Sequence, residues 1–396
     1  MSVADDDGMH DVRFDRIMKI LNVNMSIDPI TGGGTAERTV KIARYLARHG
    51  VDSSLLTSDI GLDEKLCRSL SDVSLHVLRN FYTRYYISRI SFKRIATIVA
   101  QADVVHLMNH WTAINAAVYR VCRQLNKPYV VCPAGALLYY GRSLLLKRMY
   151  NYIVGKNIIK NATRHVAIPA EEAYQFESYG IDPKSVVVIP NGIDQDDFNA
   201  RDDHRFREKH ALGSDPFILF MGRLNSIKGP DLLLNAFAAC HKMSSRYRLV
   251  FAGPDDGMQK ILETTAKKRA IENRVHFIGY VGGEEKSQAY HAAEILAVPS
   301  RQEAMSIVAI EAGITGTPVL MTDVCGFRHI EAINGGMIVK PEVTAIGDGL
   351  QTLLEDREES KQRGQRLKGY VLSNFTWDSI IAKYISVFRT ISASSN

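Results

Sequence analysis

The sequence has 396 residues, of which 46% are hydrophobic and 23% charged, the ordinary composition of a globular protein long enough for two domains. Its five cysteines lack any Cys-x-x-Cys spacing, which argues against a metal or disulfide framework and favours a reducing compartment. No uncharged apolar run is long enough to cross a membrane, and segment 1–11 is too acidic and polar for a signal peptide. A cytoplasmic protein is expected.

The net charge of +6 is unevenly distributed along the chain. Between Arg79 and Arg164 there are fourteen Lys or Arg residues and a single acid, Asp103. A region of one sign indicates an anionic partner, either lipid head groups, a phosphate-bearing acceptor or nucleic acid. Because no recognition module for nucleic acid is present, nucleic acid is not expected as a partner. Peripheral contact of region 79–164 with an anionic membrane surface is expected instead.

Segment 81–95 is the strongest candidate for that contact. Aromatic and aliphatic residues alternate there with cations, which predicts an amphipathic helix lying at a membrane interface. The alternative is a helix that packs by its apolar stripe and leaves its cations in water.

In chain order, segment 1–14 is predicted to be a disordered leader, followed by alternating strands and helices. The predicted strands of the first half are 19–24, 53–57, 74–77, 103–111, 127–132, 163–168 and 185–189. The predicted helices are a segment after Arg38 that ends at Leu46, and 112–126, 144–160 and 171–179. A glycine run, 32–34, precedes the first helix, where backbone could approach a ligand and the helix N-terminus could face an anion. A flexible turn is the alternative, and the spacing does not fit the dinucleotide-binding fingerprint.

The second half repeats the alternation. Strands are predicted at 217–221, 249–252, 275–278, 295–298, 318–321 and 335–339. Helices are predicted at 229–244, 259–272, 305–314, 346–354, 358–373 and 377–391. This order implies a parallel sheet with helices on both faces, and such sheets bind ligands at the carboxyl ends of their strands.

Four charged residues follow those strand ends. Arg223 and Lys228 bracket the turn after 217–221, where two fixed cations suit a diphosphate. Glu303 follows the strand at 295–298, and Glu311 lies on the next helix, whose N-terminus favours an anion. A carboxylate suits vicinal hydroxyls. Each residue alone could be a solvated surface charge, but both glutamates interrupt apolar surroundings, where an unpaired charge is costly.

The ordered set resembles the retaining glycosyltransferases of family 4, which have the GT-B fold. The resemblance rests on Gly-Arg-Leu at 222–224 with Lys-Gly at 228–229, on the glutamates of 303–311, and on Pro-Asn-Gly-Ile-Asp at 190–194. It covers about residues 17–390. It implies an α/β protein with two Rossmann-like, doubly wound domains facing an interdomain cleft. The implied parts are an acceptor-side domain at 15–198, a nucleotide-sugar-binding domain at 199–375, and a final segment, 376–396, that returns to the first domain.

The resemblance also implies roles on the donor side. Arg223 and Lys228 would hold the diphosphate, Glu303 would contact the transferred sugar, and Glu311 would hold the ribose hydroxyls. The other donor-binding residues that it implies are Gly33, Gly34, Gly253, Ile278, Met305, Ser306 and Ile307. The donor is a nucleotide diphosphate sugar, and no cofactor or metal is expected. Asp255-Asp256, the nearest pair of carboxylates, is expected to cap the following helix.

On the acceptor side the resemblance implies His106, Asn109, His110 and Ala134. Ala134 departs from the family pattern, because many members carry a histidine there for the reacting sugar. Same-face attack, with the departing phosphate acting as base, would tolerate this change. The expected acceptor is a saccharide or lipid-linked saccharide, in the synthesis of polysaccharide or cell-envelope glycans. Alternatives are a non-catalytic GT-B binding subunit, a nucleotide-sugar epimerase and a phosphorylase.

Overall fold

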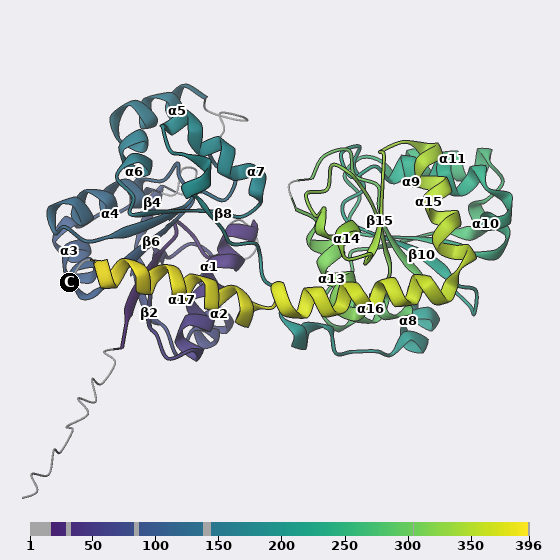
Figure 1. The fold of residues 1–396 in the computed structure, drawn as a ribbon, viewed down its shortest axis with the longest axis horizontal. Coiled ribbons are helices and arrows are strands. Elements are labelled where there is room, and N and C mark those ends of the chain that lie inside the picture. The colour runs from purple at the N-terminus through teal and green to yellow at the C-terminus, as the bar shows by residue number, and fades with distance from the viewer. Residues whose placement is uncertain (1–16, 29–32, 83–86, 138–143, 304, 395–396) are drawn as a thin grey trace, which may run out of the picture. The chain divides into compact units, whose positions relative to one another are not determined.

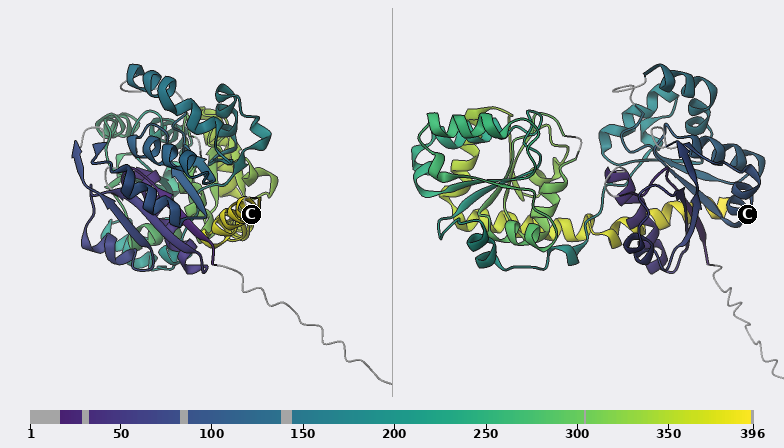
Figure 2. Two further views of the ribbon diagram at one scale, coloured as in Figure 1. Left: turned by 90° about the vertical axis from the view of Figure 1, so that its left-hand side faces the viewer. Right: turned by 180° about the vertical axis from the view of Figure 1, so that it is seen from behind.

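The computed structural model describes residues 17–28, 33–82, 87–137, 144–303 and 305–394. The chain divides into two compact units, Met1–His165 with Ile385–Asn396, and Val166–Tyr384. Figure 1 shows a sheet with helices on both faces in each unit, and Figure 2 shows the same layers from two other sides. The predicted leader, 1–14, lies outside the described residues, and the predicted domain limits at 198 and 375 stay a prediction.

The first sheet has seven parallel strands in the order β3-β2-β1-β6-β7-β8-β9. The strands are β1 Lys19–Val23, β2 Asp52–Ser58, β3 Ser74–Leu78, β6 Val104–Met108, β7 Tyr129–Cys132, β8 Arg164–Ala167 and β9 Val187–Val188. All five residues of β6 are buried, as expected for a central strand covered on both faces. The strand order reverses between β1 and β6, which is where such sheets bind ligands.

The α-helices described in the first half are α1 Gly33–Arg48, α2 Glu64–Ser69, α3 Phe92–Gln101, α4 Ala113–Gln124, α5 Leu144–Tyr150, α6 Lys156–Lys160 and α7 Ala170–Ala173. The helix predicted at 112–126 corresponds to α4, whereas α2 and α3 were not predicted and the helix predicted at 171–179 continues after α7 as a 3-10 helix, Tyr174–Tyr179. α1 begins at Gly33, so Gly33 and Gly34 form its first turn rather than a loop before it. The predicted helix at 144–160 is confirmed, but a π-helical turn, Asn151–Gly155, joins α5 to α6.

The predicted helix over 81–95 is wrong. β4 Asn80–Tyr82 pairs with β5 Ile87–Ser88 as an antiparallel hairpin, and α3 begins only at Phe92. Residues 83–86 lie outside the described part of the chain. Aromatic and β-branched residues such as Phe81, Tyr82 and Ile87 favour strands, and the pairing of β4 with β5 is a contact that the pattern of cations does not reveal. The Ser91 hydroxyl then caps α3 by accepting a hydrogen bond from the Arg94 N–H.

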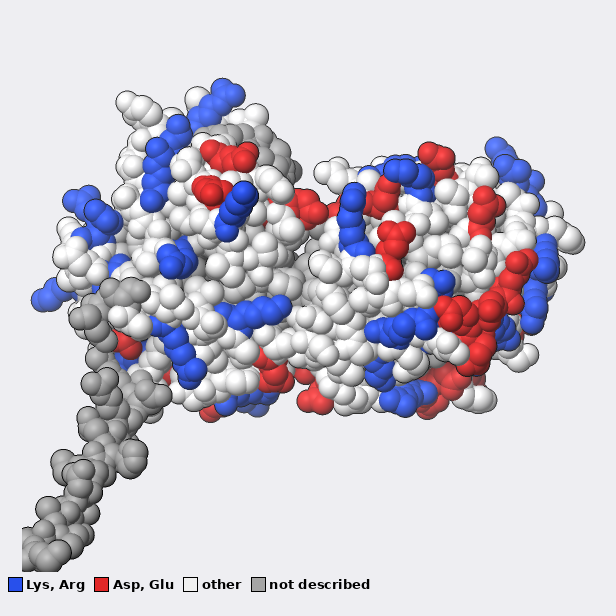
Figure 3. All heavy atoms as spheres, in the orientation of Figure 1, with Lys and Arg blue, Asp and Glu red and all other residues white. Residues whose placement is uncertain are grey.

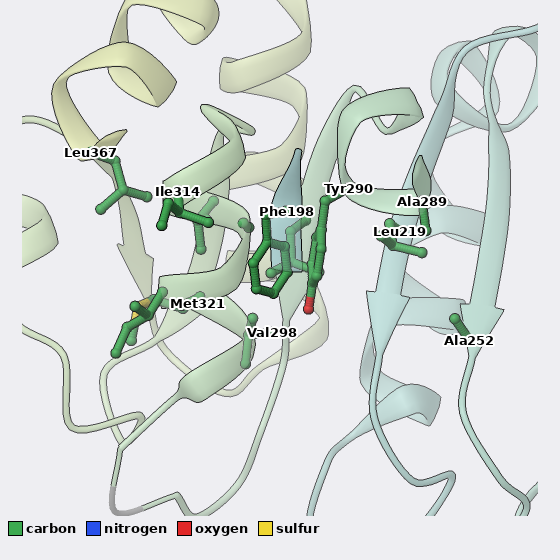
Figure 4. Packing of buried hydrophobic residues seen from close by; sticks show 14 of the residues in the cluster. Phe198, Leu219, Ala252, Ala289, Tyr290, Val298, Ile314, Met321 and Leu367 are labelled. Atoms are coloured by element: carbon green, nitrogen blue, oxygen red, sulfur yellow. The ribbon is translucent and has the colours of Figure 1, made fainter. Parts of the chain in front are cut away.

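The second sheet has six parallel strands in the order β12-β11-β10-β13-β14-β15. They are β10 Phe217–Met221, β11 Arg248–Ala252, β12 Val275–Gly279, β13 Ile295–Val298, β14 Val319–Thr322 and β15 Gly336–Val339. Alternate residues of β10 enter separate cores, Phe217 and Leu219 on one face and Ile218 and Phe220 on the other. Each such side chain contributes roughly 1.5–3 kcal/mol by burial. Figure 4 shows part of the first core.

The helices of the second unit cover both faces of this sheet. They are α8 Asp203–Lys209, α9 Pro230–Ala239, α10 His241–Arg246, α11 Gln259–Lys268, α12 Glu284–Ala292, α13 Ile307–Thr315, α14 His329–Ala332, α15 Val343–Glu355, α16 Arg357–Asn374 and the first part of α17 Trp377–Ser394. The single helix predicted at 229–244 is divided at Cys240 into α9 and α10. No helix in the described ranges has the length and apolar character needed to cross a membrane.

The motif at 190–194 pairs with the start of α17. The Ile193 N–H donates to Phe375 O at 2.6 Å, and the Trp377 N–H donates to Ile193 O at 3.1 Å. A Cβ on Gly192 would lie 2.6 Å from the Trp377 ring, which explains the glycine. Farther along α17, Phe388 belongs to the first unit, where it is fully buried.

Candidate functional site

The predicted donor residues gather at the point where the second sheet reverses its strand order. β10 and β13 are neighbours there, and their carboxyl ends lead to Lys228 and Glu303. Lys228 Nζ lies 2.9 Å from Glu303 Oε1, and the Ser300 hydroxyl donates to Glu303 Oε2 at 2.9 Å. The Glu303 carboxylate is 11% exposed and Lys228 32%. The structure therefore brings these two predicted residues into direct contact at the edge of the sheet.

Two glycines let the loops at this edge approach one another. Gly253 has φ +146°, and a Cβ there would lie 1.9 Å from Gly222 O. Gly229 has φ +67°, and a Cβ there would lie 2.1 Å from Pro299 O. Side chains are excluded at both positions because backbone atoms cannot give way. Gly229 also precedes Pro230, the first residue of α9, a favoured start for a helix.

An arginine clamp holds the lysine loop against the glutamate loop. Arg301 donates two hydrogen bonds to the Asp231 carboxylate, at 2.8 and 2.6 Å, and a third to Ser226 O at 2.7 Å. The pKa of Asp231 is lowered, because the bonds and charge of Arg301 outweigh the effect of burial. Lys228 and Glu303 are thus positioned by a pair that sequence reasoning missed, since seventy residues separate Asp231 from Arg301.

An anion could be received beside this pair. Arg223 is exposed, and its guanidinium has no hydrogen bond or ion pair with any described residue. α13 begins at Ile307, so its first backbone N–H groups lie just beyond Ser306. The Ser306 hydroxyl is fully buried and has no hydrogen-bond partner within the described chain. A cation, a helix N-terminus and a spare hydroxyl are the groups that a phosphate requires.

Glu311 lies on α13, and both oxygens of its carboxylate already accept hydrogen bonds from other side chains. Lys286 Nζ lies 2.6 Å from Glu311 Oε1, and the Tyr290 hydroxyl donates to Oε2 at 2.7 Å. Burial, reinforced by the Glu311 charge, raises the pKa of Tyr290 well above its ordinary value. Tyr290 stands beside Phe198 in Figure 4, and Lys286 Nζ lies 5.2 Å from the centre of that Phe198 ring. Sequence reasoning missed Lys286 and Tyr290, which share one face of α12 without any recognisable motif.

The other apolar residues predicted on the donor side either pack against the core or are exposed. Ile278 and Met305 are half-buried and pack against the first core, and Ile307 is 45% exposed. Asp255 accepts three backbone hydrogen bonds, from Gly257, Met258 and Gln259, which confirms that it caps the turn before α11. No group of His, Cys, Asp or Glu side chains suited to a metal ion occurs among the residues that the structure describes.

The first unit has its own polar cluster where its strand order reverses. Asn109 follows β6 with φ +66°, an unusual conformation for a residue other than glycine. Its amide donates to Asn24 Oδ1 at 2.8 Å, and the Asn24 amide donates to Thr39 Oγ1 at 2.9 Å. Ala134, after β7, is half-buried and also has positive φ, +55°. Strained backbone of this kind is common at ligand sites.

The two predicted histidines of this unit lie in its interior. His106 is fully buried and donates from Nδ1 to Asn22 Oδ1 at 3.0 Å, with Phe388 against its ring. His110 is 1% exposed and is hydrogen-bonded through Nε2 to Asn151 Oδ1 at 2.8 Å. Burial lowers the pKa of His106 to about 3 and that of His110 to about 4. Both side chains are buried within the first unit, so the acceptor-side role of His106 and His110 stays a prediction.

These depressed values predict acid lability. Because the unfolded histidines take up protons below about pH 6.5 and the folded ones do not, the free energy of unfolding should fall as pH drops from 7 to 5. His106 alone should account for on the order of 2 kcal/mol of this loss. Urea unfolding of the His106→Gln variant, which keeps a donor toward Asn22, should show a shallower dependence on pH. His204→Gln, at an exposed histidine, should keep the original slope, and an unchanged slope in His106→Gln would show that His106 titrates normally.

Solved structures of glycosyltransferases share this architecture, which is the GT-B fold. HepE of Anabaena, in complex with UDP, aligns with a TM-score of 0.74 at 19% identity over 94% of this chain and 100% of that one. Sucrose-phosphate synthase of Thermosynechococcus elongatus aligns with a TM-score of 0.69 at 21% identity over 95% and 100%.

Two family models cover most of the sequence. "Glycosyltransferase Family 4" matches residues 32–197, and "Glycosyl transferases group 1" matches residues 202–369. The chain belongs to this family of glycosyltransferases.

Curated relatives support the same assignment. A D-inositol 3-phosphate glycosyltransferase of Nocardia farcinica is 35% identical over 232 residues, which are 56% of this chain and 51% of that protein. The match thus spans about half the length of that relative. An uncharacterized glycosyltransferase of Methanocaldococcus jannaschii is 26% identical over 94% of this chain and 98% of its own.

Proposed function

We propose that this glycosyltransferase moves a sugar from a nucleotide diphosphate sugar to a saccharide or lipid-linked saccharide, with retention of the anomeric configuration. The observation that carries the proposal is the contact of Lys228 with Glu303 at the reversal point of the second sheet. Arg223, whose guanidinium has no partner among the described residues, follows the same strand as Lys228. One cation and one carboxylate are thereby held together where a leaving diphosphate and a sugar hydroxyl would meet.

The chemistry follows from the charges. The bond between the anomeric carbon and the diphosphate oxygen breaks, and its electron pair leaves with the diphosphate. The negative charge of the leaving diphosphate would be stabilised by Arg223, Lys228 and the first N–H groups of α13. These groups are already fixed before the reaction, so little reorganisation is needed in the transition state. With these positive groups, departure of the diphosphate would not require a metal ion. The acceptor oxygen then bonds to the same face of the anomeric carbon, and its proton passes to the departing phosphate.

Glu311 would hold the ribose hydroxyls, as the family resemblance implies. Its carboxylate oxygens already accept hydrogen bonds from Lys286 and Tyr290, but each oxygen has a second lone pair. Lys286 and Tyr290 therefore act as positioning residues that fix the carboxylate. A nucleotide donor also agrees with the solved structures, since HepE is described in complexes with UDP and with UDP-glucose.

Thermal-shift measurements would test the donor site first. UDP, GDP, ADP and CMP are compared, each with and without its sugar and with and without EDTA. A ligand that binds only the folded state at about 100 times its Kd adds about 2.7 kcal/mol to the free energy of unfolding. One diphosphate is expected to raise the Tm, to do so equally in EDTA, and to lose the effect in Arg223→Ala.

The matched control is Arg269→Ala, at an exposed arginine after α11. This variant should respond to the diphosphate as the parent protein does. If no nucleotide shifts the Tm, the donor-site assignment fails and the chain is a GT-B binding subunit. If a nucleotide sugar binds but is neither hydrolysed nor transferred, the protein binds the donor without catalysing transfer.

A further inference from the structure

The helical segment 144–160 presents an apolar side to solvent. Leu145 is 71% exposed, Tyr152 90% and Ile153 68%, and Leu144 and Met149 are each nearly half exposed. Leu146 is also 48% exposed. Leu145, Met149, Tyr152 and Ile153 recur at helical spacing on the side away from the buried Asn151, and together with Leu144 and Leu146 at the start of α5 we call them the apolar face. Contiguous apolar exposure of this kind marks an interaction surface, because a monomeric protein rarely leaves it uncovered.

The opposite side of the segment is firmly anchored in the first unit. Asn151 and Gly155 are buried there, with Ile158 and Ile159. A Cβ on Gly155 would lie 2.2 Å from Asn151 Oδ1, so glycine permits the π-helical turn to close on that amide. The Asn151 amide is in turn bonded to His110. The exposed side is therefore presented by a fixed scaffold, and the segment cannot simply roll over to bury it.

Other contacts join the segment to the loop after β6. The Tyr150 hydroxyl donates to Thr112 O at 3.0 Å, and the Lys147 ammonium lies 5.7 Å from the centre of the Trp111 ring. The same loop carries Asn109 and His110 at the reversal point of the first sheet. A partner bound to the apolar face would accordingly sit on the element that braces the predicted acceptor side.

Charge indicates the kind of partner. Segment 144–160 contains four cations, Lys147, Arg148, Lys156 and Lys160, and no acid. Arg148, Lys156 and Lys160 are exposed beside the apolar face. Figure 3 shows Lys and Arg side chains along the part of the unit where Figure 1 places α3 to α6. A second copy of the chain docked face to face would oppose these cations with the same cations, which disfavours self-association.

We infer that the apolar face and its three exposed cations bind the surface of a membrane that contains anionic lipid. Leucine, isoleucine and methionine would enter the boundary of the acyl chains, tyrosine would lie at the level of the head groups, and the cations would meet lipid phosphates. The inference replaces the helix predicted at 81–95, which the pairing of β4 with β5 contradicts, with 144–160 as the membrane-docking element. It rests on the proposed function only for the idea that the acceptor is carried by a lipid.

Vesicle flotation of the full chain without nucleotide tests the inference. Vesicles of phosphatidylcholine with phosphatidylglycerol should bind the protein at least roughly tenfold more tightly than pure phosphatidylcholine, and salt at about 0.5 M should reduce this preference. The triple variant Leu145→Gln, Tyr152→Gln, Ile153→Gln should lose binding to both. A charge variant, Arg148→Gln, Lys156→Gln, Lys160→Gln, should lose the preference for phosphatidylglycerol.

The matched control replaces three exposed apolar residues elsewhere, Leu125→Gln, Tyr174→Gln and Ile261→Gln, and should bind as the parent does. Equal loss in this control, or no binding by the parent protein, overturns the inference. A parent protein that is dimeric without vesicles, and monomeric in the apolar-face variant, also overturns it, because a second copy then covers the face. Because no nucleotide is present, binding to vesicles by a protein without any diphosphate response would leave this inference standing and reject the proposed function.

Discussion

Replacement of Lys228 by alanine is expected to reduce turnover of the nucleotide sugar by roughly two to three orders of magnitude. The side chain is one of two cations proposed for the leaving diphosphate. It is also the partner of Glu303 at 2.9 Å, so its removal leaves a carboxylate that is only 11% exposed without its counter-charge. Release of nucleoside diphosphate, measured at saturating donor, gives kcat directly.

Two further variants test whether the loss of turnover comes from the contact between Lys228 and Glu303. Lys260→Ala, at an exposed lysine on α11, should leave kcat unchanged. If Lys228 and Glu303 act as a unit, the double variant Lys228→Ala, Glu303→Gln should lose little more activity than the more damaged single variant. Full turnover by Lys228→Ala would reject the assignment of the diphosphate to this edge of the sheet.

Replacement of Glu311 by alanine is expected to raise KM for the donor at least roughly tenfold, and more than about a hundredfold if both ribose hydroxyls are bound. Each hydrogen bond to a charged acceptor is worth about 1.5–3 kcal/mol, and the ribose would lose both. The change should act mainly on KM, because the ribose is held alike before and during transfer. Initial rates over a range of donor concentrations separate the two constants.

Glu311→Ala should also destabilise the fold, so a control is needed. The substitution leaves the fully buried Tyr290 hydroxyl without its acceptor, at about 1–3 kcal/mol. Tyr290→Phe removes the same hydrogen bond but keeps the carboxylate. It should lower the Tm and raise KM much less than Glu311→Ala does, because Lys286 still holds the carboxylate. An equal rise of KM in both variants would mean that packing around α12, and not the carboxylate, sets the affinity for the donor.

The parts of the site that could be predicted are those fixed by local rules. Parallel strands place their carboxyl ends on one edge, so Lys228 and Glu303 were expected together and lie together. The bond of Glu311 to Lys286 and Tyr290 could not be predicted in this way. It depends on how α12 packs beside α13, and neither residue carries a local signal of that packing.

The pairing of β4 with β5 and the π-helical turn also could not be predicted from local sequence rules. The rings and cations in 81–95 were interpreted as a helix lying on a membrane, although aromatic and β-branched residues also favour strands and the pairing of β4 with β5 has no local signal. The π-helical turn depends on the bond of Asn151 to His110, forty-one residues earlier in the chain. His106 lies within β6 and His110 follows it, both inside the strand predicted at 103–111, but their burial depends on helices that pack over them, including Phe388 of α17 beside His106.

The division of α17 between the two units has a consequence for the order in which the protein is made. The first unit contains β1 to β7, yet its core includes Phe388 and Ile391, at the far end of the sequence. The second unit is one continuous stretch, so it can fold while the first still lacks its last helix. The first unit therefore cannot bury the surface of His106 that Phe388 covers until residues 385–396 have been made.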